Sequence, residues 1–441
     1  MTLPAKPSLL APDPAVRRRN AAEARFRIFG RVAIALALGA LAVLLGTITI
    51  RGLPAFTQTF VAVPVTLDAA RLDPGGARDP AHLRRITTFG YAPLLPEAMR
   101  RLVAAEGIAT PLGGTEMAAL LSAGSPAVLR DAVLADPSLI GQTVTFRLHA
   151  SSRVDGYLKG RVTRASVERD TRISVAQLDL VDALVDRGLM ERRFNPAFIT
   201  GADASESRPE TAGFGVSMVG SFAMMLAVLA LSLPVAVAAS IWLEEFAPRN
   251  RWTDLVEVNI SNLAAVPSIV FGILGLAFFI QVAHLPQSAP IVGGLVLSLM
   301  TLPRIIIPAR AALKAVPPGI RDAALGVGAS RMQAVFHHVL PLALPGILTG
   351  LILALAQALG ETAPLLLIGM VGYVATNYPA GPAEAFTAPN SAMPAQIYEW
   401  ANRADPAFYE RAWGGIILLL VFMVAMNLLA ILLRRRFERR W

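Results

Sequence analysis

Six long runs of this chain carry no charged residue, and they limit the fold more than any other feature of the sequence. A helix of about 20 apolar residues crosses the ~30 Å hydrocarbon core of a bilayer, and each run is long enough to do so. The runs cover residues 32–50, 213–243, 258–283, 285–303, 339–360 and 412–433. With 54% hydrophobic and 16% charged residues, the sequence predicts an all-α polytopic membrane protein with six transmembrane helices.

The net charge of +9 comes largely from arginines at the two ends of the chain, next to the first and last apolar runs. Basic residues flank membrane helices on the cytoplasmic side, so this distribution indicates cytoplasmic termini and argues against a nucleic-acid partner. Residues 1–31 are expected to form a basic cytoplasmic arm, disordered through residue 30. The apolar run after it lacks a small-x-small cleavage pattern, so we interpret it as a retained helix rather than a signal peptide. The absence of cysteine excludes disulfide and thiol chemistry.

A polar region, residues 53–211, separates the first two apolar runs. Apolar alternation predicts strands at 59–67 and 143–149. Helical spacing and terminal signals predict helices at 95–106, 125–135 and 174–187. About 155 residues are enough to bury a core, so we expect an inserted α+β domain here.

Residues 317–345 lie between two apolar runs and do not resemble a simple connector. Pro317 and Pro318 suit the first turn of a helix over 320–327, and Gly326 and Gly328 are expected to supply a turn. Ala323 and Ala324 give that helix a bare face.

A second helix is predicted to follow that turn. Ser330 is expected to cap it, with Gln333 completing a capping box. Four apolar residues then follow at helical spacing, and two prolines are expected to end the helix. The four are Met332, Val335, Phe336 and Val339, and the prolines are Pro341 and Pro345. A helix–turn–helix with a small-residue face is suited to docking in a groove of a soluble partner.

This stretch resembles the EAA loop of ABC-importer permeases, with Asp322 in place of Glu and His338 where Val or Ile is usual. The residues that match are Asp322, Ala323, Ala324, Gly328, Leu340 and Pro341. Residues 360–366, Gly-Glu-Thr-Ala-Pro-Leu-Leu, resemble the corresponding stretch of PstA-type phosphate permease subunits. Residues 242–247 resemble a second stretch of phosphate permeases. The resemblance covers about residues 213–436. It implies that the chain has the type I importer permease fold and lies in the bacterial inner membrane. It also implies a permease that transports inorganic phosphate and couples to an ATPase through the six matching residues.

The resemblance also implies partners: a dimer of ATP-binding subunits, a second permease subunit and a periplasmic phosphate-binding protein, besides membrane lipid. Three predicted crossings separate the insert from the basic EAA-like loop, so the two lie on opposite faces of the membrane. The expected layout is therefore a cytoplasmic arm, a transmembrane helix, a periplasmic α+β insert and a permease core. Their ranges are 1–31, 32–52, 53–211 and 212–441.

The ATP-hydrolysing site that drives transport is expected on another chain. A phosphate-binding loop needs G-x-x-x-x-G-K-[ST], and the sequence contains no Gly-Lys dipeptide. We therefore predict a transport subunit and not an enzyme, with no catalytic residue, metal or cofactor of its own, and ATP bound by the partner subunit.

Glu361 lies within or near the end of an otherwise apolar helix. An ionised group at mid-membrane costs at least about 3 kcal/mol, so its carboxylate should face the bundle interior or water. It could hold an arginine, accept a proton from monobasic phosphate or join two helices. Arg304 and Arg310 are candidate partners or anion contacts, or else they anchor the nearby cytoplasmic end. Thr362 and Gln357 could line a path or merely bridge helices.

The sequence leaves two other functions open. The same architecture could carry sulfate, molybdate, phosphonate or another solute. Alternatively, the chain could be a membrane-anchored receptor or scaffold whose working part is the insert, which would leave the docking loop and Glu361 unexplained.

Overall fold

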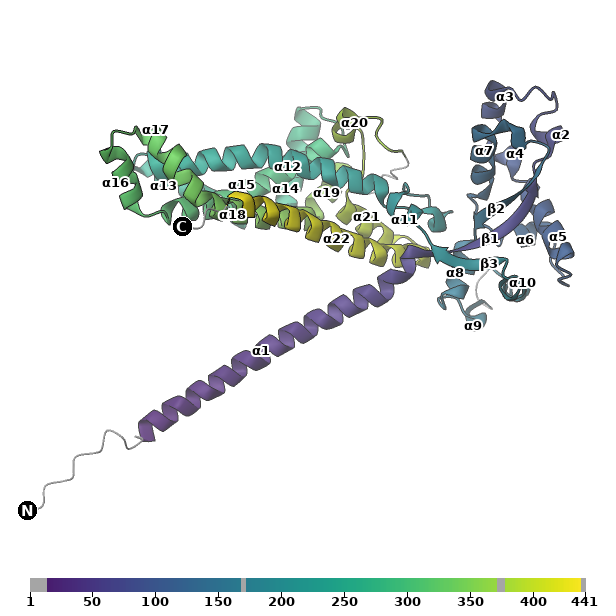
Figure 1. The fold of residues 1–441 in the computed structure, drawn as a ribbon, viewed down its shortest axis with the longest axis horizontal. Helices are drawn as coiled ribbons and strands as arrows, with labels where there is room; N and C mark the ends of the chain where they lie inside the picture. Colours follow the sequence, from purple (N-terminus) through teal and green to yellow (C-terminus); the bar gives the residue numbers. More distant parts are fainter. Residues whose placement is uncertain (1–13, 168–171, 371–376, 438–441) are drawn as a thin grey trace, which may run out of the picture. The chain divides into compact units, whose positions relative to one another are not determined.

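The computed structural model describes residues 14–167, 172–370 and 377–437 (Figure 1). Its first helix, α1 (Pro14–Gly52), is continuous through the basic arm and the first apolar run. The expectation of a disordered arm is therefore wrong for residues 14–30, and residues 1–13 lie outside the described residues. Alanine and arginine are strong helix formers, and neither proline nor glycine interrupts residues 15–29. Residues up to Arg51 form a unit of their own, and the rest of the chain forms a second unit.

Within the second unit, four long apolar helices form a bundle in which neighbouring helices pack along each other (Figure 1). They are α12 (Gly215–Ile241, extended by the π-helical turn Trp242–Phe246), α15 (Pro290–Lys314), α18 (Leu340–Gly360) and α22 (Pro406–Phe437). Small residues allow close approach. A Cβ added to Gly294 would lie 2.5 Å from Ala227, and one on Gly350 would lie 2.5 Å from Pro308. Such contacts are typical of helix association within membranes.

The third predicted span, 258–283, is not one helix. It consists of α13 (Arg251–Ala265) and α14 (Ser268–Leu274), which continues as the π-helical η5 (Gly275–Val282). The two halves are bent by 102°. Pro267 disfavours helical geometry at the residue before it, and Val266 is extended, with ψ of 130°. The described residues thus hold five single helices long and apolar enough to cross a membrane, or six if the bent pair counts as one span.

The polar region is an α+β domain, as expected. Its antiparallel sheet has the order β2-β1-β3, with β1 (Thr57–Thr66) in the centre, β2 (Thr143–His149) on one side and β3 (Met190–Phe194) on the other. The two predicted strands are confirmed. Sequence patterns do not reveal β3, because Met-Glu-Arg-Arg-Phe lacks apolar alternation, and four of its five side chains are exposed.

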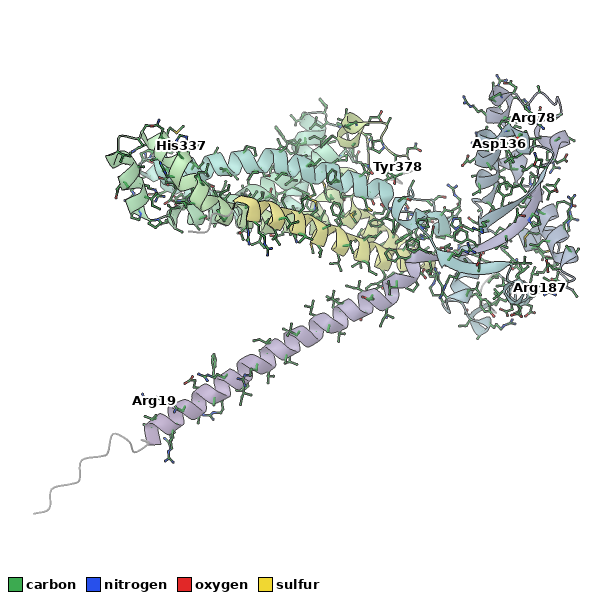
Figure 2. All side chains as sticks on the ribbon, viewed as in Figure 1. Arg19, Arg78, Asp136, Arg187, His337 and Tyr378 are labelled. Carbon is green, nitrogen blue, oxygen red and sulfur yellow. The ribbon has the colours of Figure 1, made fainter. Side chains whose placement is uncertain are left out.

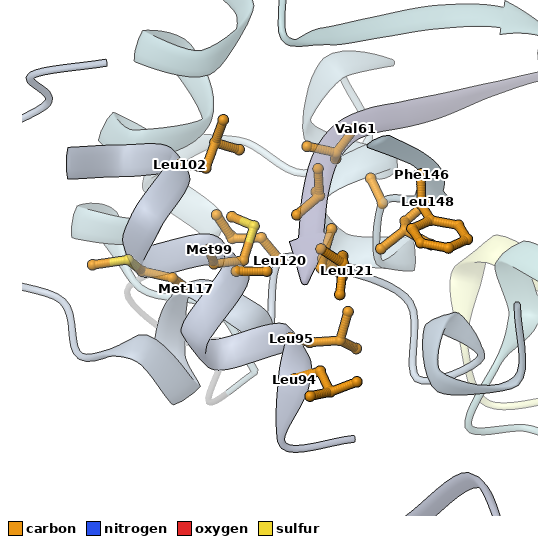
Figure 3. Close-up of a cluster of buried hydrophobic side chains, with 14 of the residues drawn as sticks. Val61, Leu94, Leu95, Met99, Leu102, Met117, Leu120, Leu121, Phe146 and Leu148 are labelled. Atoms are coloured by element: carbon orange, nitrogen blue, oxygen red, sulfur yellow. The ribbon is translucent and has the colours of Figure 1, made fainter. Parts of the chain in front are cut away.

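Three helices of this domain match the sequence patterns: α5 (Leu94–Ala105), α7 (Ser125–Ala135) and α10 (Val175–Asp186). Side chains from β1, β2 and α5 meet in one core that includes Val61, Met99 and Phe146 (Figure 3). Shorter helices complete the domain: α2 (Ala69–Leu72), α3 (Pro80–Arg85), α4 (Thr88–Tyr91), α6 (Gly114–Ala118), α8 (Ser152–Leu158), α9 (Arg164–Val167) and α11 (Ala197–Thr200). The 3₁₀ turns are η1 (Leu53–Phe56), η2 (Pro137–Leu139) and η3 (Pro209–Thr211).

Among the described residues between α18 and α22 are α20 (Pro382–Thr387) and α21 (Met393–Asn402), which follow the short helix α19 (Ala363–Leu365) and the π-turn η7 (Leu366–Met370). The apolar face of α21 packs on protein. Trp400 is fully buried, and its ring lies 5.1 Å from that of Phe214 and 6.3 Å from that of Phe408.

Acid is expected to weaken the insert through His149 on β2. Burial, and secondarily the charge of Arg411, lowers the pKa of His149 from 6.5 to about 4. A neutral buried histidine contributes its full stability above pH 6.5, and this contribution falls as pH drops towards 4, by up to about 3 kcal/mol. Thermal unfolding of the detergent-solubilised chain at pH 7.5 and 4.5 should therefore show a smaller acid loss in His149→Gln than in wild type. The exposed-residue control His82→Gln should behave like wild type, and an acid loss in His149→Gln equal to wild type would contradict this assignment.

Candidate functional site

The docking segment, residues 317–345, forms a short helix α16 (Pro318–Gly326), a turn and then α17 (Arg331–Ala334). Gly328 has a φ of +90°, which supports the expected turn, whereas Gly326 is the last helical residue of α16. The predicted capping box is confirmed. The Ser330 backbone N–H donates to Gln333 Oε1 at 2.9 Å, and the Gln333 N–H donates to Ser330 Oγ at 3.3 Å.

The second helix does not end at Pro341, in contrast to the sequence expectation. It runs through the π-helical turn η6 (Val335–Val339) into α18, so Arg331–Gly360 is one continuous apolar helix. Pro341 lies in the first turn of α18, directly after the π-turn, and Pro345 lies inside it. In membrane helices, local π-helical adjustments can satisfy the backbone groups that a proline leaves without a partner, so the helix can continue past it.

Two residues of the predicted apolar stripe are buried and the other two are exposed. Val335 and Val339 are buried against α15, with Val339 fully inaccessible, whereas Met332 and Phe336 are exposed. On α16, Ala324 is buried while Asp322 and Ala323 face solvent. Leu325 and Val327 add further exposed apolar side chains, 43% and 87% accessible. The docking segment therefore offers both a carboxylate and large apolar groups to the exterior.

A groove accompanies these exposed groups, between the end of α15 and η6. His337 and His338 line one side of it, and Pro317 and Ile320 line the other. His338 is exposed in this groove instead of occupying a core position, so the departure from the usual Val or Ile leaves the packing below it intact. Figure 2 shows His337 at the α16–α17 end of the helical bundle.

Arg321 holds the docking segment to two other helices. Its Nη2 lies 2.6 Å from Glu245 Oε1, at the end of the π-turn that follows α12, and its Nε donates to the same carboxylate at 3.1 Å. Its Nη1 donates to the Val316 carbonyl at 2.7 Å, and its Nη2 to the Leu313 carbonyl at 2.8 Å, at the C-terminus of α15. A cation is favourable at a helix C-terminus, and a bidentate carboxylate fixes its orientation.

Sequence patterns do not indicate this arrangement, and the nearest signal is the permease-like stretch 242–247, which contains Glu245. Arg310 has a similar structural role, because its Nη2 lies 2.7 Å from Glu257 Oε1 on α13 and 3.6 Å from Glu244 Oε2. Arg310 is thus occupied by two carboxylates and does not approach Glu361.

Arg304 and Glu361 are brought together. Glu361 caps the C-terminus of α18, immediately before the short helix α19 (Ala363–Leu365) and the π-turn η7 (Leu366–Met370), and Arg304 lies on α15. Arg304 Nη1 is 3.7 Å from Glu361 Oε1, and each side chain is about one-fifth exposed. Nη1 has no hydrogen-bond partner among the described residues. Thr362 next to the pair is half-buried, whereas Gln357 is exposed on α18.

Three comparisons place the chain among known proteins. The model of the family "Binding-protein-dependent transport system inner membrane component" matches residues 219–441, and a model of a domain of unknown function matches residues 13–168. The probable ABC transporter permease protein YqgI of Bacillus subtilis is 28% identical over 268 residues, which cover 58% of this chain and 88% of that protein.

The phosphate transport system permease protein PstA of Xylella fastidiosa is 30% identical over 227 residues, which cover 51% of this chain and 76% of that protein. A solved bacterial ABC transporter involved in the import of alginate is a weaker match, at 16% identity and a TM-score of 0.40, covering 51% of this chain and 80% of that chain. The family match spans α12, α15, the docking segment, α18 and α22. The chain therefore belongs to the family of inner-membrane components of binding-protein-dependent transport systems, as a transport component and not an enzyme.

Proposed function

We propose that this chain is the permease subunit of an ATP-driven importer that carries inorganic phosphate into the cell. The observation that best supports phosphate as the cargo is the Arg304–Glu361 pair at the break between α18 and α19. Glu361 belongs to the stretch 360–366 that resembles PstA-type permeases, and Arg304 reaches it from α15. Relatives named as phosphate permeases, such as that of Xylella fastidiosa, support the same cargo. Arginine binds phosphate oxygens through paired N–H groups, and Arg304 Nη1 has no hydrogen-bond partner among the described residues.

The proposed assembly has a second permease subunit and two ATP-binding subunits, with a binding protein delivering phosphate from the periplasm. Both termini and the docking segment lie in the cytoplasm, and the insert lies in the periplasm. Asp322, Ala323 and the exposed apolar groups of α16 and α17 contact the ATPase, while Gly328 provides the turn between the two helices. Leu340 and Pro341 join this segment to α18, and Ala324 is the buried side chain of α16.

The contacts of Arg321 suggest how the ATPase acts on the pore. When the ATPases close, the docking segment moves, and α12 and α15 follow because Arg321 binds groups on both. Glu361 holds Arg304 in place, and its carboxylate accepts a hydrogen bond from a protonated phosphate oxygen. Thr362 is the nearest uncharged group that could assist. Arg310, bound to Glu257 and Glu244, serves the helix packing instead.

Glu361→Gln is expected to reduce phosphate uptake about tenfold or more while leaving the amount of assembled importer within about twofold, since a hydrogen bond to a charged group contributes about 1.5–3 kcal/mol. Uptake of radiolabelled phosphate and co-purification of the ATPase measure the two effects. Glu206→Gln, an exposed carboxylate of the insert, is the matched control. Unchanged uptake kinetics in Glu361→Gln would remove Glu361 from the mechanism.

The cargo is tested by radiolabelled uptake at low external phosphate in cells with and without this chain. Uptake should disappear without the chain and return with the wild-type chain. Competition with unlabelled sulfate, molybdate and phosphonate then tests selectivity. Equal phosphate uptake in cells with and without the chain would contradict phosphate as the cargo. If the chain transports one of the competitors instead of phosphate, that competitor is the cargo.

A further inference from the structure

A cluster of buried charges joins the insert to the last membrane helix. Lys159, at the C-terminus of α8, places its Nζ 2.7 Å from Asp155 Oδ2 and 2.8 Å from Glu410 Oε1 on α22. Arg161 adds a second cation, with Nε 2.6 Å from Glu410 Oε2 and Nη2 3.4 Å from Asp155 Oδ2. The Lys159 and Asp155 side chains are each 3% exposed and that of Glu410 is 8% exposed.

The insert holds its share of this cluster rigidly. Asp155 Oδ1 accepts hydrogen bonds from the backbone N–H and the hydroxyl of Thr59 on β1, at 3.0 and 2.9 Å. Lys159 Nζ also donates to the Thr57 carbonyl at 2.7 Å. The charges are therefore fixed to the central strand of the sheet and not to a surface loop.

The helix side is fixed in the same way. Arg411, fully enclosed next to Glu410 on α22, donates to the carbonyls of Ala212 at 2.6 Å and Glu210 at 2.7 Å, where the insert ends and α12 begins. It also donates to Gln58 Oε1 on β1 at 3.0 Å. Arg411 thus connects the first strand of the insert, its last residues and the start of α22.

A second contact holds the neighbouring helix α21. Arg403 Nη2 lies 3.0 Å from Asp203 Oδ2, and Trp400 Nε1 donates to Asp203 Oδ1 at 2.9 Å. Around this polar contact, Phe198 from the insert packs with Trp400 and Phe214. Linked domains with small polar interfaces normally move relative to each other. Here, buried charges and an aromatic cluster occupy the junction.

Buried ion pairs add little net stability, because desolvation offsets much of the attraction. Removing one partner is different, since it leaves an uncompensated charge in an apolar place. We infer that Lys159 and Glu410 are positioning residues for transport: they hold the insert and the outer end of α22 as one moving body throughout the transport cycle. The insert is then a fixed outer part of the permease and not a receptor module on a flexible linker. The part of this inference that concerns transport rests on the proposed function.

The absence of cysteine from the chain allows a direct test with two spin labels. Phe89→Cys on the insert and Val421→Cys on α22 replace side chains that are 85% and 60% exposed. Distances between the labels are measured by pulsed electron paramagnetic resonance in the full importer, without nucleotide and with ATP plus vanadate. We expect one narrow distance, unchanged between the two states. A broad distribution, or a distance that changes with nucleotide, would overturn the inference.

Charge variants connect this geometry to transport. Lys159→Met leaves Asp155 and Glu410 with one cation between them, so we expect a broadened distance and about a tenfold loss of uptake rate at saturating substrate. Lys159→Met combined with Glu410→Gln removes one charge of each sign and should restore both the narrow distance and most of the uptake. Arg187→Met, at an exposed pair with Glu106, is the control and should change neither.

The outcomes separate the two proposals. If Lys159→Met changes neither the distance nor uptake, or if the double variant is as impaired as the single one, the positioning role is wrong. If cells with the wild-type chain take up no phosphate but the distance between the two labels is narrow and unchanged by nucleotide, the junction is rigid. In that case the proposal that phosphate is the cargo is wrong. Should the single variant fail to reach the membrane, the double variant and the distances in the wild-type chain still decide the question.

Discussion

Replacing Gly328 with aspartate is expected to abolish phosphate uptake while the protein remains in the membrane. Gly328 has a φ of +90°, beyond the left-handed values near +57° that aspartate can adopt. The strain of about 1–2 kcal/mol favours other conformations of the turn by a factor of about 5–30. The added carboxylate also lies on the segment offered to the ATPase. Uptake of radiolabelled phosphate and the membrane content of the protein measure the two effects.

Gly326 provides a matched control within the same segment. It is helical, and a Cβ there would meet no atom within 4 Å, so Gly326→Asp adds the same charge without backbone strain. We expect this variant to keep at least about a third of the uptake, since an exposed charge contributes little. Equal losses in both variants would assign the effect to charge and not to the turn. Normal uptake by Gly328→Asp would contradict the coupling role of the segment.

Glu245→Gln is expected to uncouple ATP hydrolysis from transport. The Glu245 side chain is 10% exposed and makes a bidentate pair with Arg321. A hydrogen bond to a charged group contributes about 1.5–3 kcal/mol. Its loss therefore raises the equilibrium constant for detachment of α16 from α12 by a factor of about 10–100. In proteoliposomes with the assembled importer, the ATP hydrolysed per phosphate transported should rise by at least about tenfold, because docking movements no longer reach α12.

The neighbouring glutamate serves as the control for this variant. Glu244 lies 3.6 Å from Arg310, and Glu257 binds the same arginine more closely, at 2.7 Å. Glu244→Gln should therefore change the ATP-to-phosphate ratio by less than about threefold, in line with a weak, partly exposed pair. If Glu245→Gln transports phosphate at the normal ratio, or if both variants are equally affected, Arg321 does not carry the movement of the docking segment to α12.

Local patterns in the sequence predicted the elements that local forces determine. The alternation of Val144, Phe146 and Leu148 marks β2, and the Ser330–Gln333 pair marks the start of α17. The chemistry of an intramembrane carboxylate led to Glu361 and to Arg304 as a possible partner, 57 positions apart in the sequence. Composition alone separated the polar insert from the membrane helices.

Other features depend on the fold as a whole. The pairing of Arg321 with Glu245 joins residues that are 76 positions apart, and nothing in either neighbourhood specifies the other. Prolines misled the prediction in both directions: Pro341 does not end its helix, whereas the residues around Pro267 bend a span that hydropathy presents as continuous. The sequence also gave no sign that Lys159, one of only three lysines, would be buried against Glu410.

The continuous helix from Arg331 to Gly360 has a mechanical consequence. At 1.5 Å per residue its 30 residues make a rod about 45 Å long, with the docking segment at one end and Glu361 next to the other. A tilt of about 5° about the end that bears the docking segment would displace the far end by about 4 Å, which is more than the 3.7 Å that separates Arg304 from Glu361. A helix of this length would therefore convert a small rotation at the docking segment into the making or breaking of an ion pair near its far end.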